Sequence, residues 1–180
     1  MGVMYDYFTA SSDEIAAATI DVLGGPGGWP PRLPMPFRDL AALYGTEGAR
    51  SFLKPTVRLS GSGNPVLSTN GFDPTVDLCA VHALLTGARL DDVLDRLGDT
   101  VIAEQDGGER LVLSIDTDVR DALAESTPDQ LQHVAREWAE SEAPHRRLEP
   151  QGTSELLEQL AELARTARSR GEGLYCWVCV

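Results

Sequence analysis

The last seven residues of the chain, 174–180, constrain its fold more than any other stretch. They read LYCWVCV, a run that is apolar and rich in β-branched and aromatic side chains. These side chains favour a strand, and leaving them in water would forfeit the free energy that burial supplies. We therefore expect the chain to finish as a buried strand that enters a sheet.

This run also holds two of the three cysteines, Cys176 and Cys179, at C-x-x-C spacing. Strand positions three apart point to opposite faces, so a disulfide between them would require a distorted backbone. Redox pairs with this spacing depend on a helix N-terminus that lowers the pKa of one thiol. We interpret both cysteines as structural residues of the strand.

A zinc site is the alternative interpretation of the cysteines. Cys79 and His82 have a spacing that places two ligands on one helical face, and Cys176 and Cys179 would bring the number of ligands to four. A strand splays the second pair, however, and short matches of this kind arise by chance. The sequence therefore predicts no metal and no other cofactor.

The composition limits the partners. The chain has 180 residues, which suits a single domain, and 42% of them are hydrophobic, which is enough for a core. Twenty-eight acidic residues against 15 basic ones give a net charge of -13. Nucleic acids and anionic membranes attract basic surfaces, so both are excluded as expected partners. A basic protein or a cationic ligand fits this charge.

The compartment is inferred from the start of the chain and from the cysteines. The first residues include Asp6 and lack the basic start and apolar core of a signal peptide. No stretch approaches the ~18 apolar residues that span a bilayer. A small, odd number of cysteines is not a disulfide framework, so we expect a reducing cytoplasm.

The secondary-structure pattern predicts an α+β single domain, 1–180, with a mixed sheet, N- and C-terminal strands and about five to six helices. Two hairpins are expected, and several helices have recognisable caps, among them Ser11, Asp73, Asp116, Thr127 and Thr153. The predicted strands cover 3–8, 56–59, 66–69, 100–104, 110–115 and 174–180. The predicted helices cover 14–22, 74–86, 90–97, 117–125, 128–142 and 153–170, with a further short one at 37–44.

Residues 24–63 interrupt this pattern as a loop-dominated excursion. Its first part, 24–36, contains four glycines and five prolines, which leave few backbone donors for regular structure. Five basic residues against two acidic ones lie between Arg32 and Arg58. Trp29 and Arg32, which belongs to a P-x-x-P match, are candidate recognition residues. Trp29 either packs onto the body or marks a contact surface, and we favour packing.

Three stretches resemble the YfbM-like family of small bacterial proteins of unknown function. They are 5–8 with the capped helix after it, 119–123 leading into 129–131, and the terminal helix that closes on 171–173 before the last strand. The end of the chain also resembles uncharacterised actinobacterial proteins. The resemblance implies an α+β domain in the bacterial cytosol, transfers no catalytic residue, and does not cover 24–63.

No combination of residues in the sequence points to catalysis. The chain shows no serine in a nucleophile-elbow pattern and no phosphate-binding glycine loop, and its histidines lie apart from one another. We therefore expect a non-catalytic protein-binding module, of which an immunity-like protein that binds a basic toxin through an acidic face is one form.

The competing hypothesis is a small-molecule-binding domain or a small enzyme. Its pocket would lie between 24–63 and the body, with Asp73, His82, His133 and Arg58 as polar candidates. The sequence leaves the oligomeric state open.

Overall fold

The strand order places the two ends of the chain side by side in the middle of one sheet. The computed structural model describes residues 3–22, 24–27, 38–39, 41–43, 45, 57–59, 65–96, 100–140 and 150–180, with the backbone alone for 57–59, 150 and 151. The last strand, β6 (Gly173–Cys179), pairs with β1 (Met4–Ala10) on one side and with β5 (Arg110–Ile115) on the other. The expectation of a buried terminal strand is confirmed.

The remaining strands extend the sheet in both directions. β3 (Pro65–Asn70) and β2 (Val57–Leu59) continue beyond β1, and β4 (Val101–Gln105) continues beyond β5, giving the order β2-β3-β1-β6-β5-β4. Every pairing among the described strands is antiparallel, whereas the sequence suggested a mixed sheet. Two of the pairings, β2–β3 and β4–β5, join consecutive strands at the two predicted hairpins, and such pairs are antiparallel.

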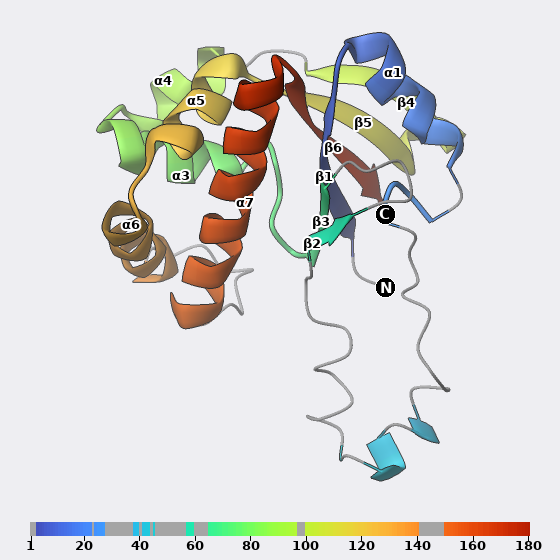
Figure 1. Cartoon of the computed structure of the whole chain (residues 1–180), viewed down its shortest axis with the longest axis horizontal. Helices are drawn as coiled ribbons and strands as arrows, with labels where there is room; N and C mark the ends of the chain where they lie inside the picture. Colours follow the sequence, from blue (N-terminus) through green and yellow to red (C-terminus); the bar gives the residue numbers. More distant parts are fainter. Residues whose placement is uncertain are drawn as a thin grey trace.

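One face of the sheet carries the main helical layer, made by α3 (Asp77–Thr86), α5 (Thr117–Glu125), α6 (Pro128–Glu140) and α7 (Pro150–Arg170) (Figure 1). The core between them includes the aromatic rings of Phe72 and Trp138, whose centroids lie 5.7 Å apart. The buried Tyr7 hydroxyl donates to the Phe72 carbonyl at 2.8 Å, so its polar atom is satisfied.

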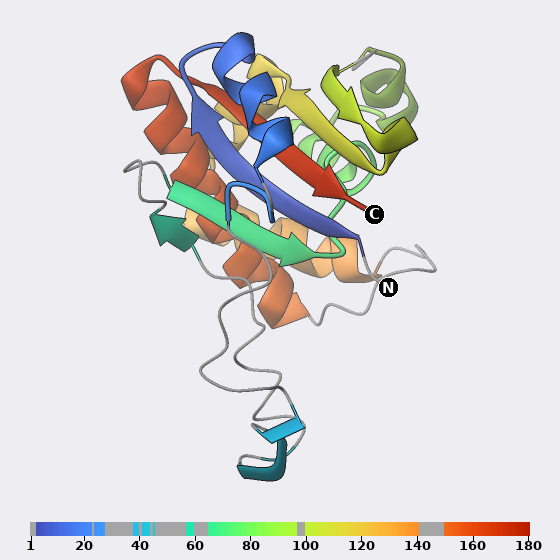
Figure 2. The same cartoon turned by 90° about the vertical axis from the view of Figure 1, so that its right-hand side faces the viewer.

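The opposite face of the sheet has a smaller cover. Figure 2 looks onto this face, with α1 (Asp13–Ala17) in front and α7 behind. The turn η1 (Ala18–Asp21) continues α1, and a second cluster that contains Phe8, Val112 and Trp177 lies against the sheet here. The result is one α+β domain, as the sequence predicts.

The two cysteines of β6 lie on these opposite faces. Cys176 belongs to the main core, and Cys179 packs against the second cluster. All three cysteines are free thiols. Because the two strand thiols point to different sides of the sheet, they are not arranged to share one zinc ion, and the alternative interpretation loses its second pair of ligands.

Several helix ends follow the predicted caps. Asp116 accepts from the Asp118 backbone N–H at 2.7 Å, and Thr127 forms a reciprocal box with Gln130. Gly87 ends α3 in the left-handed region, at φ 71°. The short helix α4 (Leu90–Arg96) and the 3-10 turn η2 (Asp106–Gly108) also lie where a helix and a hairpin turn were expected.

Three of the predicted helix starts are wrong. Asp73 is not the N-cap of α3, because a turn over 74–76 separates it from the first helical residue, Asp77. Helix α7 begins at Pro150, because the fixed backbone angle of proline suits the first helical position. Thr153 therefore lies inside the helix, where it is fully buried, instead of capping it. Ser12 replaces Ser11 as the cap of α1 and accepts from the Ile15 N–H at 3.4 Å. The α-helix then ends at Ala17 and continues as η1 to Asp21.

Candidate binding site

Two hollows lie among the side chains of helices α3, α4 and α5. Helix α3 packs against both of the others. Asp73 fixes the approach to α3, because its carboxylate accepts from the backbone N–H groups of Thr75 at 2.7 Å and Val76 at 3.0 Å. Val93 is the only described residue of α4 that is buried, and it packs on Cys79 and Ala83 of α3. The seven-residue helix α4 is thus attached to the body by a small contact.

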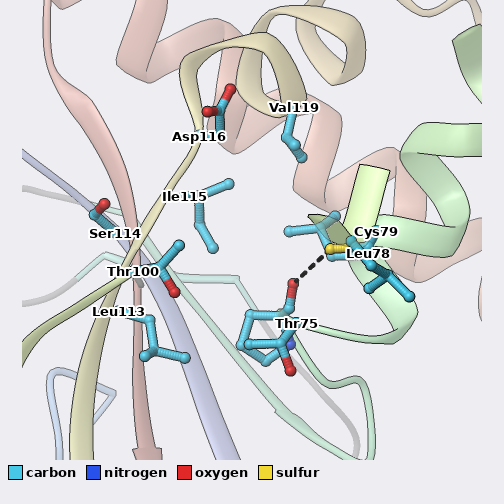
Figure 3. Close-up of a pocket in the computed structure, with 11 residues that line it drawn as sticks. Thr75, Leu78, Cys79, Thr100, Leu113, Ser114, Ile115, Asp116 and Val119 are labelled. Carbon is cyan, nitrogen blue, oxygen red and sulfur yellow. Dashed lines mark hydrogen bonds between the residues drawn. The ribbon is translucent and has the colours of Figure 1, made fainter. Parts of the chain in front are cut away.

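A small cavity lies between these helices and the end of strand β5. Its volume is about 130 Å³ (Figure 3). Aliphatic side chains and one thiol supply most of the wall, with Thr75, Thr100, Ser114 and Asp116 among the polar members. The apolar members include Leu78 and Cys79 of α3, Leu94 of α4, Leu113 and Ile115 of β5, and Val119 of α5.

The interior of this cavity is largely apolar. In Figure 3 the Asp116 carboxylate points away from the space between the strand and α3. The Thr75 hydroxyl donates to Asp73 at 2.6 Å, so it is already satisfied outside the cavity. The Cys79 thiol lies 3.9 Å from the Pro74 carbonyl, and burial followed by nearby Asp73 raises its pKa to about 11. At neutral pH this thiol is protonated and behaves as a small apolar group.

A second, wider hollow lies on the other side of the Val93 contact. It has a volume of about 470 Å³ and opens to solvent. Four carboxylates contribute to it, together with an arginine and a histidine. The charged and titratable members are His82 of α3, Asp92 and Arg96 of α4, and Asp118, Asp121 and Glu125 of α5.

Arg96 links the three helices at this hollow. One guanidinium nitrogen donates to the Asp118 carboxylate at 2.9 Å, and the other lies 3.3 Å from Nε2 of His82. Burial, and then the Arg96 charge, lower the pKa of His82, against the weaker opposite effect of Asp118 and Asp116. Since a guanidinium can only donate, the neutral ring carries its proton on Nδ1, which has no hydrogen-bond partner among the described residues.

The residues proposed from the sequence do not form one site. Asp73 lies beside the small cavity and also accepts from the Tyr5 hydroxyl at 3.0 Å, whereas His82 lines the wider hollow. His133 is exposed on α6, 3.6 Å from Glu137, and Arg58 lies on the edge strand β2. Trp29, Arg32 and most of the excursion that was to form a pocket lie outside the described residues.

The sequence reasoning missed Leu94, Arg96 and Asp118. Arg96 and Asp118 lie 22 residues apart in the sequence, so no local spacing predicts their ion pair. The repeat of leucine at 90 and 94 was a usable signal, because residues four apart lie on one helical face.

In the part of the chain that the structure describes, no group of three or more His, Cys, Asp or Glu side chains has an arrangement that would hold a metal ion. None of the helices in that part is both long enough and apolar enough to cross a membrane.

The fold and the hollows define a class: an α+β domain whose antiparallel sheet carries a helical face with two recesses. Comparison of the chain with protein-family profiles, with curated proteins and with solved structures finds no match. The resemblance to the YfbM-like family stays a prediction.

Proposed function

We propose that the protein is a non-catalytic binding module that takes a basic protein partner on the face formed by α3, α4 and α5. An immunity-like protein that neutralises a basic toxin is one form of such a module. The wide hollow carries the proposal, because four carboxylates meet there around a recess that is open to solvent. We also propose a cytoplasmic setting, which the three free thiols of the protein support.

The charges on α4 and α5 favour a cationic partner. Helix α4 carries Asp91, Asp92 and Asp95 against the single arginine Arg96. Three of the carboxylates at the hollow have arginine partners: Asp118 with Arg96, Asp121 with Arg120 and Glu125 with Arg168. These ion pairs are at least partly exposed, so they cost little to rearrange when a partner's cations arrive.

The test is capture from a bacterial lysate by immobilised protein, with the retained proteins identified by mass spectrometry. The wild type is compared with the double variant Asp92→Asn/Asp95→Asn, which removes two exposed charges from α4. The matched control is Glu155→Gln/Glu158→Gln, which removes two exposed charges from α7. The wild type and both double variants are tested at about 20 mM and about 300 mM salt, because the screening of charge–charge interactions differs strongly between these concentrations.

We expect a basic protein that the wild type and the α7 variant retain at low salt. The α4 variant should retain much less of it, and high salt should release it. The proposal would be contradicted if both double variants retained the same amount of the basic protein, or if retention did not change with salt concentration.

A small-molecule-binding domain or a small enzyme is the second candidate, and the small cavity lined by Leu78, Leu113 and Val119 favours it. Its volume of about 130 Å³ is below the ~300–1,000 Å³ of typical ligand pockets. The residues that line it all belong to 74–119. We therefore rank this candidate second.

A further inference from the structure

We propose that the cavity of about 130 Å³ is an anchor pocket for one aliphatic side chain of the basic partner, with lysine or arginine residues flanking that side chain. The inference rests on the proposed function and names the chemistry of the segment that binds. It joins the small cavity to the acidic surface of α4, which lies between the two recesses.

The size and lining of the cavity suit such a side chain. An apolar cavity of ~150 Å³ in another protein holds a benzene molecule, so a space of this order accepts a leucine, isoleucine or methionine side chain. Leu78, Leu113 and Val119 provide apolar contacts in its wall, and the Asp116 carboxylate points away from it (Figure 3). A charged group inside would lose hydration without gaining a partner, so the occupant is neutral and aliphatic.

Four exposed apolar residues favour a protein segment over a small free molecule; one of them lines the cavity and the others lie within one helical turn of a wall residue in the sequence, and together they are called the collar. Val76 is 54% exposed, Leu90 40%, Leu94 43% and Val101 41%. Leu94 is itself part of the wall, and Leu90 lies one helical turn before it. Val76 and Val101 each follow a wall residue in the chain. A molecule that only filled the cavity would leave this collar in water, whereas a partner segment would cover it.

The acidic residues of α4 define the flanks of the segment. Asp91 follows Leu90, and Asp95 follows Leu94, so each exposed leucine has a carboxylate next to it. Cations beside the anchor would therefore meet negative charge at the collar while the aliphatic group enters the cavity. This complementarity also excludes an acidic partner segment, because like charges would face each other.

The probe is a labelled peptide, acetylated and amidated, with the sequence Lys-Lys-Leu-Lys-Lys, and its matched control has alanine in place of leucine. Isoamylamine, which carries the same branched aliphatic group and one cation, represents a small free ligand. Fluorescence anisotropy gives the dissociation constant of each peptide. Alkylation of Cys79, followed by peptide mapping, reports whether the cavity is occupied, because this thiol is part of the wall.

We expect the leucine peptide to bind about tenfold more tightly than the alanine peptide and than isoamylamine, and to slow the alkylation of Cys79. Cys79→Leu fills the cavity and should remove most of the difference between the two peptides. Leu94→Ala removes apolar contacts from one wall of the cavity. Because Leu94 is exposed, the folded chain should tolerate this change, and we expect the affinity for the leucine peptide to fall about fivefold. Leu84 on α3 is 37% exposed and lies outside the cavity wall, so Leu84→Ala is the control that should change nothing.

Each other outcome overturns the inference. Equal affinity for the two peptides, or an unchanged alkylation rate at saturating peptide, shows that the cavity takes no side chain. Binding of isoamylamine as tight as that of the peptide makes the cavity a small-molecule site. If Cys79→Leu still captures the basic partner from a lysate at full strength, the anchor fails while the proposed function stands. If Asp92→Asn/Asp95→Asn captures the basic partner as well as the wild type does, the proposed function itself fails.

Discussion

At the scale of single residues, His82 is a buried group whose ionisation is coupled to the folded state. The residue is 4% exposed, and its ring lies beside the Arg96 guanidinium. Arg96 from α4, Asp118 from α5 and the α5 cap Asp116 influence its pKa, and burial is the largest influence. A protonated ring would place a second cation beside the Arg96 guanidinium.

The stability of the fold should therefore respond to acid through this residue. The pKa of His82 is lowered in the folded state, so the unfolded chain binds the proton more readily. The favourable contribution of the neutral ring is complete above the unfolded pKa of about 6.5 and is lost as the pH falls below it. We expect His82→Gln to lose less free energy of unfolding than the wild type between about pH 7.5 and pH 5.5.

Urea denaturation at several pH values measures this difference, and comparing variants cancels the shared response of the carboxylates. His133→Gln removes an exposed histidine from α6 and should behave as the wild type does. A His82→Gln curve parallel to the wild-type curve would refute the assignment.

At the scale of elements, the glycine turn at 24–27 closes the second face of the sheet on β1. The Gly27 N–H donates to the buried Asp6 carboxylate at 2.7 Å. A Cβ atom on Gly25 would lie 2.6 Å from Asp6 Oδ2 and 2.7 Å from the Trp177 ring, and Gly25 has φ 70°. Glycine is required here for both the backbone angle and the close approach.

Gly25→Ala should lower the free energy of unfolding by about 2–4 kcal/mol, the sum of left-handed strain and overpacking. Gly71 is the matched control, because it has φ 94° with nothing within 4 Å of its added Cβ. Gly71→Ala should cost about 1 kcal/mol, from the backbone alone. Denaturant titration of both variants measures the free energy of unfolding. Equal decreases in the two variants would mean that the side chains of Asp6 and Trp177 move to accommodate the methyl group at no cost.

Strand β6 supplies a second prediction at this scale. Trp177 is 1% exposed and stands opposite Asp6 on β1 and Val112 on β5. Trp177→Ala should destabilise by about 3–5 kcal/mol, out of the ~5–15 kcal/mol typical of a whole domain. Val180→Ala changes an exposed terminal residue and should have no effect.

Deletion of 174–180 should abolish soluble folding, and a soluble truncated protein with a cooperative thermal transition would show that β6 is dispensable.

Most of the elements could be predicted from the sequence because their signals are local. Caps, turn glycines and apolar periodicity lie within a few residues of the element that they define, as at Asp116 and Gly87. Errors arose where two local signals competed, as Pro150 and Thr153 did for the start of α7.

At the scale of the whole molecule, the arrangement of the strands and the site could not be predicted from such signals. The pairing of β1 with β6 joins residues from opposite ends of the chain. The cavity takes its wall from α3, α4, α5 and β5, and its polar neighbour Arg96–Asp118 bridges two of them. Each of these contacts depends on tertiary packing, about which the spacing of residues along one element carries no information.

The net charge of -13 makes a prediction that belongs to the molecule as a whole. Compact packing brings like charges closer than the unfolded chain does, so self-repulsion lowers the free energy of unfolding. Raising sodium chloride from about 10 mM to about 150 mM shortens the screening length from about 30 Å to about 8 Å. We expect the melting temperature to rise, by about 2–4 °C for each 1 kcal/mol of repulsion relieved. Glu155→Gln/Glu158→Gln, which lowers the negative charge by two, should melt higher at low salt and gain less from added salt. A melting temperature that stays constant or falls across this range would mean that local ion pairs, such as Arg96–Asp118, outweigh the repulsion that the composition implies.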